Sequence, residues 1–340
     1  MATAKEILEN VQDYYGNILK TNKDLKTSAC CAGDAFPPHV KKILPQVPKE
    51  ILERSYGCGS PVPLVLEGKT VLDLGCGTGR DVFILSRLVG PKGQVIGVDM
   101  TREQLEVARR HLTASSIKLI EGRIEDLAVL GIANNSIDIV VSNCVINLSP
   151  DKKRVFSEIF RVLKPGGELY FSDIFSSRRI EELSKDPILL GECLGGALYI
   201  EDFRRLLLEV GYPDYRVVSK AKIDIKDSEI KGKVGMIDFH SLTVRAFKLK
   251  LEDRCEDYGQ VAVYQGTIPE SPNAFVLDDH HLFEKGRPVP VCGNTAAMLE
   301  ETRYGPHFKI IGDRSTHYGL FDCGEGRGMA RHAPTSGACC

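Results

Sequence analysis

The chain has 340 residues, of which 43% are hydrophobic and 26% charged, a composition typical of a globular enzyme of two or three domains. Lysine and arginine number 44 and aspartate and glutamate 46, so the net charge of −2 gives no field that would attract nucleic acid. Residues 1–16 carry charges instead of a signal-peptide core, and no run approaches the ~20 apolar residues that span a bilayer. We therefore expect a cytoplasmic protein with no nucleic-acid or membrane partner.

Cysteine is the most informative residue type in this chain. There are 11 cysteines, an odd number spread too thinly for a secreted domain held together by disulfides. No two of them have the Cys-x-x-Cys spacing of zinc ribbons. In a reducing compartment such thiols are buried fillers, ligands of soft metals or redox groups.

Alternating strands and helices predict an α/β fold from residue 69 onward. Apolar strand-like runs alternate with helical segments, in chain order 70–74, 81–89, 94–100, 101–112, 117–120, 137–143, 152–163 and 168–175. Thr101 and Gln104 fit a capping box at one helix start, and the Pro-Gly-Gly run at 165–167 ends another helix. This order predicts right-handed βαβ units and an open parallel sheet, completed by a helix at 201–210 and strands near 215–223 and 241–248.

Four parts are expected along the chain, namely residues 1–68, 69–180, 181–250 and 251–340. The first is a polar, proline-rich N-terminal cap that carries thiols and has helices near 4–20 and 38–45. The second is a Rossmann-like nucleotide-binding domain, and the third completes its sheet. The last is a smaller α+β domain with short strands such as 259–265 and a flexible tail.

A glycine-rich loop follows the first predicted strand. Gly75, Gly77 and Gly79 allow the backbone to turn tightly and to approach a ligand without Cβ clashes. Asp99 ends the next predicted strand, where a carboxylate can accept hydrogen bonds from both hydroxyls of a ribose. The combination indicates a nucleotide site, and an ordinary strand–turn–helix without ligand is the alternative.

The spacing within this loop distinguishes two kinds of nucleotide. A dinucleotide site needs Gly-x-Gly-x-x-Gly, whereas here the third glycine comes one residue earlier and Arg80 follows it. Asp73, just before the loop, would repel a pyrophosphate but suits a ligand that bears an amino group and a sulfonium. These features favour S-adenosylmethionine as the cofactor.

Several stretches resemble the class I S-adenosylmethionine-dependent methyltransferases, namely VLDLGCGTGRD (71–81), GVDM (97–100), EGRIEDL (121–127), SNCVIN (142–147) and LKPGGELYFSD (163–173). Others are similar to the arsenite methyltransferases in particular, namely DLKTSACC (24–31), RSYGCG (54–59), DIVVSNCVINLSPDK (138–152) and GECLGGALY (191–199). Each stretch of the second group contains cysteine, which makes it the more specific signal. The resemblance is good from residue 13 to about 200 and weak beyond 250.

The resemblance implies a set of cofactor-binding residues. The glycine loop would hold the methionine end, with Cys76 fitting there as a small side chain, and Asn143 would lie near the transferred methyl group. The ribose and the adenine would contact residues that follow the next two strands. The implied residues are Asp73, Gly75, Gly77 and Gly79 at the methionine, Asp99 at the ribose, and Met100, Ile124 and Glu125 around the adenine.

The resemblance also implies substrate and redox thiols, with a tyrosine close to the metalloid, namely Cys58, Cys144, Cys193, either Cys30 or Cys31, and Tyr56. Trivalent arsenic is thiophilic, so thiolates are its natural ligands, and its lone pair can attack a methyl group without a general base. We expect Cys144 and Cys193 to form a fixed pair. Glycine-flanked Cys58 is expected to be mobile and to form a disulfide with Cys30 during turnover.

The sequence therefore predicts an enzyme that methylates arsenite and then methylarsonite, with Cys58, Cys144 and Cys193 as As(III) ligands and Cys193 in an arsenic-binding segment within 181–250. The arsenical could enter as a glutathione conjugate, thioredoxin or glutathione would restore the thiols, and the protein is expected to be a monomer. One alternative is a methyltransferase for carbon or oxygen of a small organic molecule. The other is a thiol-rich protein that only sequesters metalloids.

Overall fold

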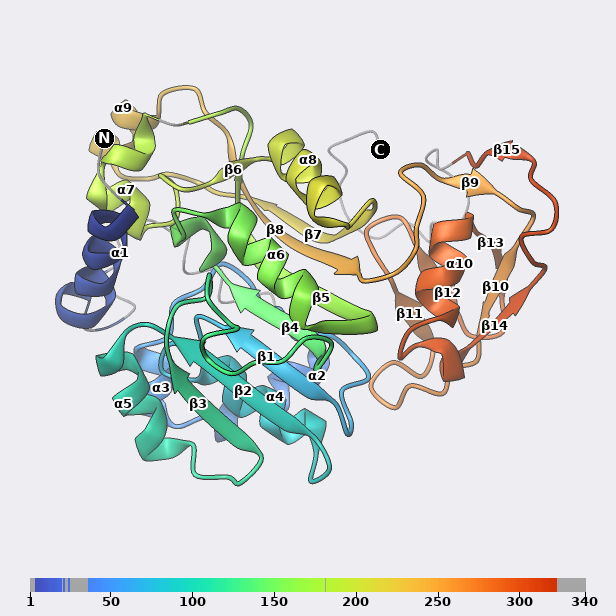
Figure 1. Ribbon diagram of the computed structural model, residues 1–340, viewed down its shortest axis with the longest axis horizontal. Coiled ribbons are helices and arrows are strands. Elements are labelled where there is room, and N and C mark those ends of the chain that lie inside the picture. Colours follow the sequence, from blue (N-terminus) through green and yellow to red (C-terminus); the bar gives the residue numbers. More distant parts are fainter. Residues whose placement is uncertain (1–3, 20, 22–23, 25–35, 181, 323–340) are drawn as a thin grey trace.

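The computed structural model describes residues 4–19, 21, 24, 36–180 and 182–322 (Figure 1). The N-terminal cap begins with α1 (Ala4–Asp13), which continues into the π-helical turn Tyr14–Ile18, so the helix expected near 4–20 is confirmed. The short helices α2 (Pro38–Lys41) and α3 (Lys49–Glu53) follow. Outside the described residues lie the predicted flexible tail and Cys30, Cys31, Cys323, Cys339 and Cys340.

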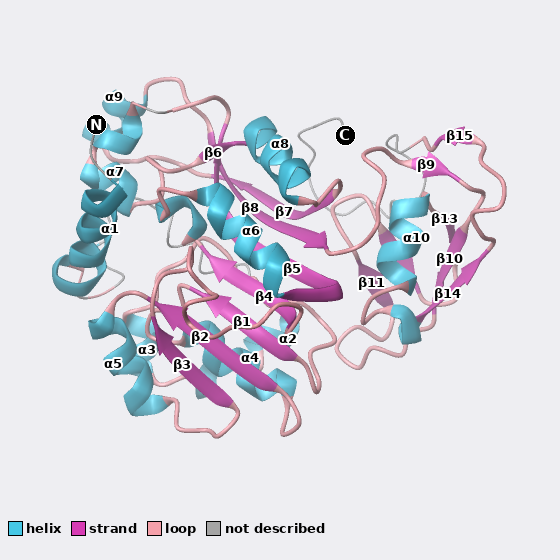
Figure 2. Ribbon diagram, viewed as in Figure 1, coloured by secondary structure: helices cyan, strands magenta, loops and turns pink. Residues whose placement is uncertain are grey.

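One sheet forms the centre of the molecule (Figure 2). Its strands follow the order β3-β2-β1-β4-β5-β8-β7, and the short β6 pairs with β5. Each strand predicted from the sequence is present. The bounds are β1 Thr70–Leu74, β2 Gln94–Asp99, β3 Ile117–Glu121, β4 Ile137–Asn143, β5 Leu163–Ser176, β6 Leu198–Tyr199, β7 Tyr215–Lys222 and β8 Phe239–Phe247.

The sheet is parallel from β3 to β5, as predicted, but β8 runs antiparallel to both β5 and β7. The expectation of a wholly parallel sheet is therefore wrong at this edge. A parallel neighbour needs a connection that crosses a sheet face, whereas β7 turns back into β8 through the short helix α9 (Ser228–Val234).

Helices cover both faces of the sheet (Figure 1). Successive residues of β1 point to opposite faces, so Val71 belongs to one apolar core and Leu72 to the other. The core with Val71 includes α4 and α5, and the core with Leu72 includes α6 and α8. The bounds of the longer helices, with the shorter α7, are α4 Arg80–Val89, α5 Arg102–His111, α6 Lys152–Val162, α7 Pro187–Gly191 and α8 Ile200–Val210.

Two local predictions need correction. Thr101 stands at the N-cap of α5, but its side chain makes no capping hydrogen bond, and the Nε2 of Gln104 donates instead to the carbonyl of Tyr15 at 2.7 Å. The capping box is absent because Gln104 serves a tertiary contact. The Pro-Gly-Gly run does not end α6, which stops at Val162. The run lies within β5, which begins at Leu163, and the pairing register with β4 shifts across it.

A small α+β unit follows the central sheet, as expected for residues beyond 250 (Figure 1). β10 lies between β13 and β14, and α10 packs with them around an aromatic core that includes Tyr264, Phe275 and Phe308. The bounds are β9 Glu256–Asp257, β10 Val261–Tyr264, β11 Ala274–Val276, β12 Leu282–Glu284, β13 Pro288–Pro290, α10 Gly293–Glu300, β14 Phe308–Ile311 and β15 Gly319–Leu320.

A buried ion-pair network joins this unit to the sheet. Glu168 of β5 is fully buried and binds the guanidinium of Arg245 on β8 at 2.6 Å, and it also pairs with Arg303 beyond α10. Arg245 donates in turn to the hydroxyl of Tyr304 at 2.6 Å and to the carbonyl of Leu277 at 2.7 Å.

Among the described segments, none of the helices is long and apolar enough to cross a membrane.

Candidate active site

A cavity opens at the carboxyl ends of β1, β2 and β4. Open α/β sheets bind their ligands at this edge. The N-terminal cap supplies another part of the wall, through Val11 and Tyr15 near α1 and the segment from Arg54 to Tyr56. The predicted cofactor residues in the wall are Asp73, Gly75, Cys76, Gly77, Asp99, Met100, Ile124, Glu125 and Asn143.

The glycines of the loop have different physical roles. All three have positive φ, 71° at Gly75, 51° at Gly77 and 87° at Gly79, which explains the residue type. A Cβ on Gly75 would lie 2.3 Å from Val145, whereas one on Gly77 would meet no atom within 4 Å. Gly79 does not line the cavity, since it caps α4 and its Cβ would lie 2.4 Å from Leu112, so the structure gives it a packing role.

Three aspartates line the cavity, and their hydrogen bonding differs. Asp99 accepts from the backbone N–H of Gly77 and of Thr101, each at 2.8 Å. Asp81 accepts from Arg80 Nε at 2.8 Å and from Asn143 Nδ2 at 3.0 Å. The Asp73 side chain makes no hydrogen bond with any residue that the structure describes, although it is only 3% exposed.

The buried carboxylates of the cavity wall therefore favour the binding of a cation. Burial, and secondly the charge of Asp81, raise the pKa of Asp73 well above its usual range, and Arg80 offsets only part of this. Burial also raises the pKa of Asp99 against the hydrogen bonds it accepts. A positively charged ligand would relieve the cost of ionising these groups, because a nearby opposite charge favours the carboxylate.

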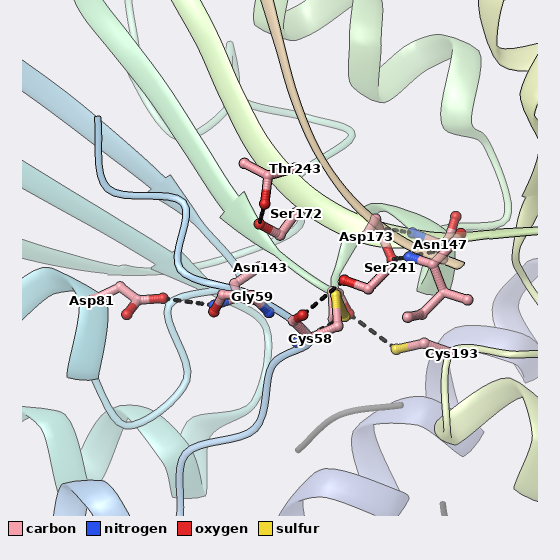
Figure 3. The surroundings of a disulfide bond; sticks show 12 residues. Cys58, Gly59, Asp81, Asn143, Asn147, Ser172, Asp173, Cys193, Ser241 and Thr243 are labelled. Atoms are coloured by element: carbon pink, nitrogen blue, oxygen red, sulfur yellow. Dashed lines mark hydrogen bonds between the residues drawn. A yellow bond between two sulfur atoms is a disulfide. The ribbon is translucent and has the colours of Figure 1, made fainter. Parts of the chain in front are cut away.

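Asn143 fastens the N-terminal cap to the end of β4. Its Nδ2 donates to the carbonyl of Gly59 at 2.8 Å, and the N–H of Gly59 donates back to its Oδ1 at 3.3 Å (Figure 3). A Cβ on Gly57 would lie 2.6 Å from that Oδ1, and one on Gly59 would lie 2.4 Å from Ser172 Oγ. The glycines beside Cys58 thus permit close packing in this structure, and the mobility expected of this cysteine during turnover stays a prediction.

Cys58, Cys144 and Cys193 lie close together beside this contact; Figure 3 labels Cys58 and Cys193. Cys58 and Cys144 form a disulfide of 2.08 Å, and the thiol of Cys193 donates to the carbonyl of Cys144 at 3.2 Å. Ser241 on β8 donates to the carbonyl of Cys58 at 2.8 Å. The structure thus pairs Cys144 with Cys58, whereas the sequence predicted a fixed pair of Cys144 and Cys193. The disulfide predicted between Cys58 and Cys30 involves a residue outside the described part of the chain.

Cys144 and Cys193 share a backbone conformation that is uncommon for non-glycine residues. Their φ angles are 58° and 63°, in the left-handed region. Such a conformation costs on the order of 1–3 kcal/mol and persists where the surroundings enforce it, often at functional sites. Glycine would avoid the cost, so the presence of cysteine at both positions points to a use for the side chains.

The loop around Cys193 is packed against the cap and the sheet. A Cβ on Gly191 would lie 2.8 Å from the ring of Tyr14, and one on Gly196 would lie 2.0 Å from the carbonyl of Asn147. In the structure their close approach is to the protein itself, and Cys193 is fully buried outside the cavity wall.

Two tyrosines join the cap to the cavity. Tyr56 lines the cavity, and its hydroxyl is buried without a hydrogen-bond partner among the described residues. Burial raises the pKa of Tyr56 to about 12, so it is neutral at physiological pH. The ring of Tyr15 lies against it with centroids 5.6 Å apart, and the Tyr15 hydroxyl donates to the carbonyl of Gly191 at 2.7 Å.

An acidic side chain lies next to the sulfurs. The carboxylate of Asp173 and the sulfurs of Cys58 and Cys144 lie within 4.8 Å of one another. Asp173 accepts from the side-chain amide of Asn147 at 2.7 Å, and burial raises its pKa to about 7. The pKa of Lys152 is lowered to about 8 by burial, against the attraction of Asp173.

Sequence reasoning missed several residues of the cavity wall, namely Arg54, Arg80, Asp81, Thr101 and Gln104. Arg80 and Asp81 stand inside the glycine-loop motif, and Arg54 begins the RSYGCG stretch. The motifs can be recognised in the sequence, but the sequence does not tell which of their side chains face the cavity. Gln104 carried no signal, since its position suggested a helix cap.

Comparisons with known proteins agree with this architecture. A methyltransferase-domain family model matches residues 66–211, the part that holds the glycine loop. The strand order, the loop at the end of β1 and this match define a class I methyltransferase fold. A model of the arsenite methyltransferase C-terminal domain matches residues 257–324.

Relatives of known activity match nearly the whole chain. It is 52% identical to an arsenite methyltransferase of Aquipseudomonas alcaligenes, over 98% of this chain and 99% of that protein. It is 40% identical to the arsenite methyltransferase of Homo sapiens, over 98% and 87% respectively. The crystal structure of an arsenic(III) S-adenosylmethionine methyltransferase from Chlamydomonas reinhardtii, 51% identical, has a TM-score of 0.82 and covers 85% of this chain and 100% of its own. The chain belongs to the arsenite methyltransferase family.

Proposed function

We propose that this chain transfers the methyl group of S-adenosylmethionine to trivalent arsenic held by Cys58, Cys144 and Cys193. Family membership supports the reaction. The observation that carries it is the meeting of two features at one place: the cavity lined by carboxylates has Cys144 in its wall, and the other two sulfurs lie beside that residue.

The cavity fits the proposed cofactor by charge and shape. Asp73 lacks a protein partner among the described residues and would bind the amino group of the methionine, while Asp99, already oriented by Gly77, would bind the ribose. Ile124 and Glu125 would contact the adenine. When bound, the cofactor supplies an electrophilic methyl group on a sulfonium, and the acidic wall favours that positive charge.

Arsenic would be held as a thiolate complex. Trivalent arsenic is soft, and thiolates both bind it and raise the electron density of its lone pair. The lone pair would attack the methyl carbon, so no side chain has to remove a proton from the nucleophile. The protein's part is to hold arsenic ~3–3.5 Å from the methyl carbon, and the constrained backbones of Cys144 and Cys193 suit that task.

The disulfide suggests how the oxidation state is reset. Attack by the lone pair makes arsenic formally pentavalent, and two thiols that close a disulfide return two electrons to it. The bond between Cys58 and Cys144 would be the product of that step. A second dithiol or two monothiols of the thioredoxin or glutathione class would then reduce it, and each turnover would consume one such equivalent.

Product analysis after incubation with arsenite, S-adenosylmethionine and glutathione tests the proposal. We expect methylated arsenic from the unmodified chain, and loss of at least 100-fold in rate for Cys144→Ser and for Cys193→Ser. Cys292→Ser is the control, since Cys292 is also buried but caps α10 in the small C-terminal unit. Equal rates for all variants would refute the thiolate complex.

The same experiment separates the two alternatives. A methyltransferase for small organic molecules would bind the cofactor without methylating arsenite. A sequestering protein would bind arsenite without binding the cofactor, which calorimetry detects. Action as a cytoplasmic monomer, use of a glutathione conjugate as substrate, and domain boundaries at 68, 180 and 250 stay predictions.

A further inference from the structure

Arg54 is a cation in the cavity wall, and no anion among the described residues neutralises it. It stands at the C-terminal end of α3, where its side chain lines the cavity. Its Nε is buried and has no hydrogen-bond partner, and its guanidinium forms no salt bridge with the residues that the structure describes. Arg80, the other arginine of the wall, is instead committed to Asp81 at 2.8 and 3.0 Å.

A buried guanidinium nitrogen without a partner is costly, and native structures nearly always satisfy such groups. Arginine has five N–H donors and cannot lose its charge, so the missing partner must be an acceptor, and a carboxylate matches its fork best. The cavity thus offers one unsatisfied cation at Arg54 and one unsatisfied anion at Asp73. A zwitterion with an amino group and a carboxylate would complement both.

The backbone of Arg54 is held against the glycine loop. The hydroxyl of Thr78 donates to the carbonyls of Arg54 and Ile51, at 3.4 and 3.2 Å, and lies 3.4 Å from the hydroxyl of Ser55. Thr78 lies between Gly77 and Gly79, close in sequence to Asp73. Arg54 therefore belongs to the end of the cavity that the glycine loop forms, and not to the end with Ile124 and Glu125.

We propose that Arg54 binds the α-carboxylate of the cofactor's methionine moiety while Asp73 binds its α-amino group. This inference rests on the proposed cofactor. Arg54 would thereby select nucleosides that carry a complete amino acid group over nucleosides that lack its carboxylate. It also ties cofactor binding to the RSYGCG segment, because Arg54 and Cys58 are parts of the same short stretch packed on Asn143.

Calorimetric titration of the full chain with three nucleosides tests Arg54 without any arsenic chemistry. S-adenosylhomocysteine carries both groups, its decarboxylated analogue keeps only the amino group, and 5′-methylthioadenosine has neither. We expect Arg54→Met to weaken S-adenosylhomocysteine about 10- to 100-fold, the range of a charged hydrogen bond, and to leave the other two within twofold. Arg54→Lys should recover part of the loss.

Arg87→Met is the matched control, since Arg87 lies on α4 over the ring of Phe83 and away from the cavity. It should bind all three nucleosides like the unmodified chain. Equal weakening of all three by Arg54→Met, or no weakening of any, would overturn the role of Arg54. If the unmodified chain binds none of them, the proposed cofactor itself is refuted.

Discussion

The carboxylate of Asp73, which has no hydrogen-bond partner in the described part of the chain, leads to a prediction in which stability and affinity change in opposite directions. Asp73→Asn keeps the shape of the side chain and removes its charge. In the free protein this residue is only 3% exposed, and neither the hydroxyl nor the amide groups of the described residues hydrogen bond to it. The substitution therefore removes a buried charge without breaking a protein hydrogen bond.

The magnitudes follow from that environment. Asparagine at position 73 would still be an unsatisfied polar group, so the variant is relieved only of the cost of the buried charge. One unit of pKa shift corresponds to about 1.4 kcal/mol, and we expect the free energy of unfolding of the ligand-free Asp73→Asn variant to rise by about 1–3 kcal/mol at pH 8. In the complex, the cofactor's amino group loses a charged partner worth about 1.5–3 kcal/mol. That loss corresponds to an increase of about 10- to 150-fold in the dissociation constant.

The pH dependence of the free energy of unfolding provides a second test of this prediction. The pKa of Asp73 in the folded chain lies above its usual value, so the folded chain binds that proton more tightly than the unfolded chain. The resulting stabilisation is complete below the usual pKa of about 4 and is lost as the pH rises through the folded-state pKa. The gain in stability of the Asp73→Asn variant over the native chain should therefore be larger at pH 8 than at pH 5.

Urea denaturation of the ligand-free proteins at both pH values measures the stability term, and calorimetry with S-adenosylhomocysteine measures the affinity. Binding to the native chain should also tighten with rising pH until Asp73 is ionised, and the Asp73→Asn variant should lack this trend. A variant that is less stable than the native chain, or that binds as tightly, would show that Asp73 has a protein partner and not a ligand partner.

Three further substitutions test the packing around the site. Gly57→Ala places a Cβ 2.6 Å from Asn143 Oδ1, so we expect at least a tenfold loss in the rate of methylation with the fold retained by circular dichroism. Gly79→Ala combines a φ of 87° with a Cβ 2.4 Å from Leu112, and it should lower the free energy of unfolding by about 1–3 kcal/mol in urea titrations. Glu168→Gln leaves Arg245 and Arg303 without their carboxylate and should cost about 3–5 kcal/mol by the same titration.

A control substitution and two possible outcomes separate these effects from a general loss of stability. Gly68→Ala has positive φ like Gly79 but no atom within 4 Å of its Cβ, so it should cost less than Gly79→Ala. An unchanged methylation rate in Gly57→Ala would mean that the Asn143 contact does not position the thiols. A two-step unfolding curve in Glu168→Gln would show that the C-terminal unit is held to the sheet mainly by this network.

The sequence by itself determined the elements and part of the cavity wall. The strands and helices of the central sheet follow from apolar periodicity, which depends only on local geometry, and the glycine loop follows from residues that a tight turn requires. Asp73, Asp99 and Asn143 were predicted correctly as wall residues because each stands at the carboxyl end of a predicted strand, and parallel strands bring those ends to one edge.

Only the tertiary structure decided how distant segments meet. The direction of β8, the contact of Gln104 with Tyr15 and the disulfide between Cys58 and Cys144 all join residues far apart in the chain, whose distance no local pattern encodes. The glycines beside Cys58 show the reason most directly: a flexible loop and a tightly packed one use the same residue, and the difference lies in the Asn143 and Ser172 side chains pressed against them. That Asp73 and Arg54 lack partners among the described residues can likewise be recognised only from the tertiary structure, because it depends on the positions of all the surrounding groups.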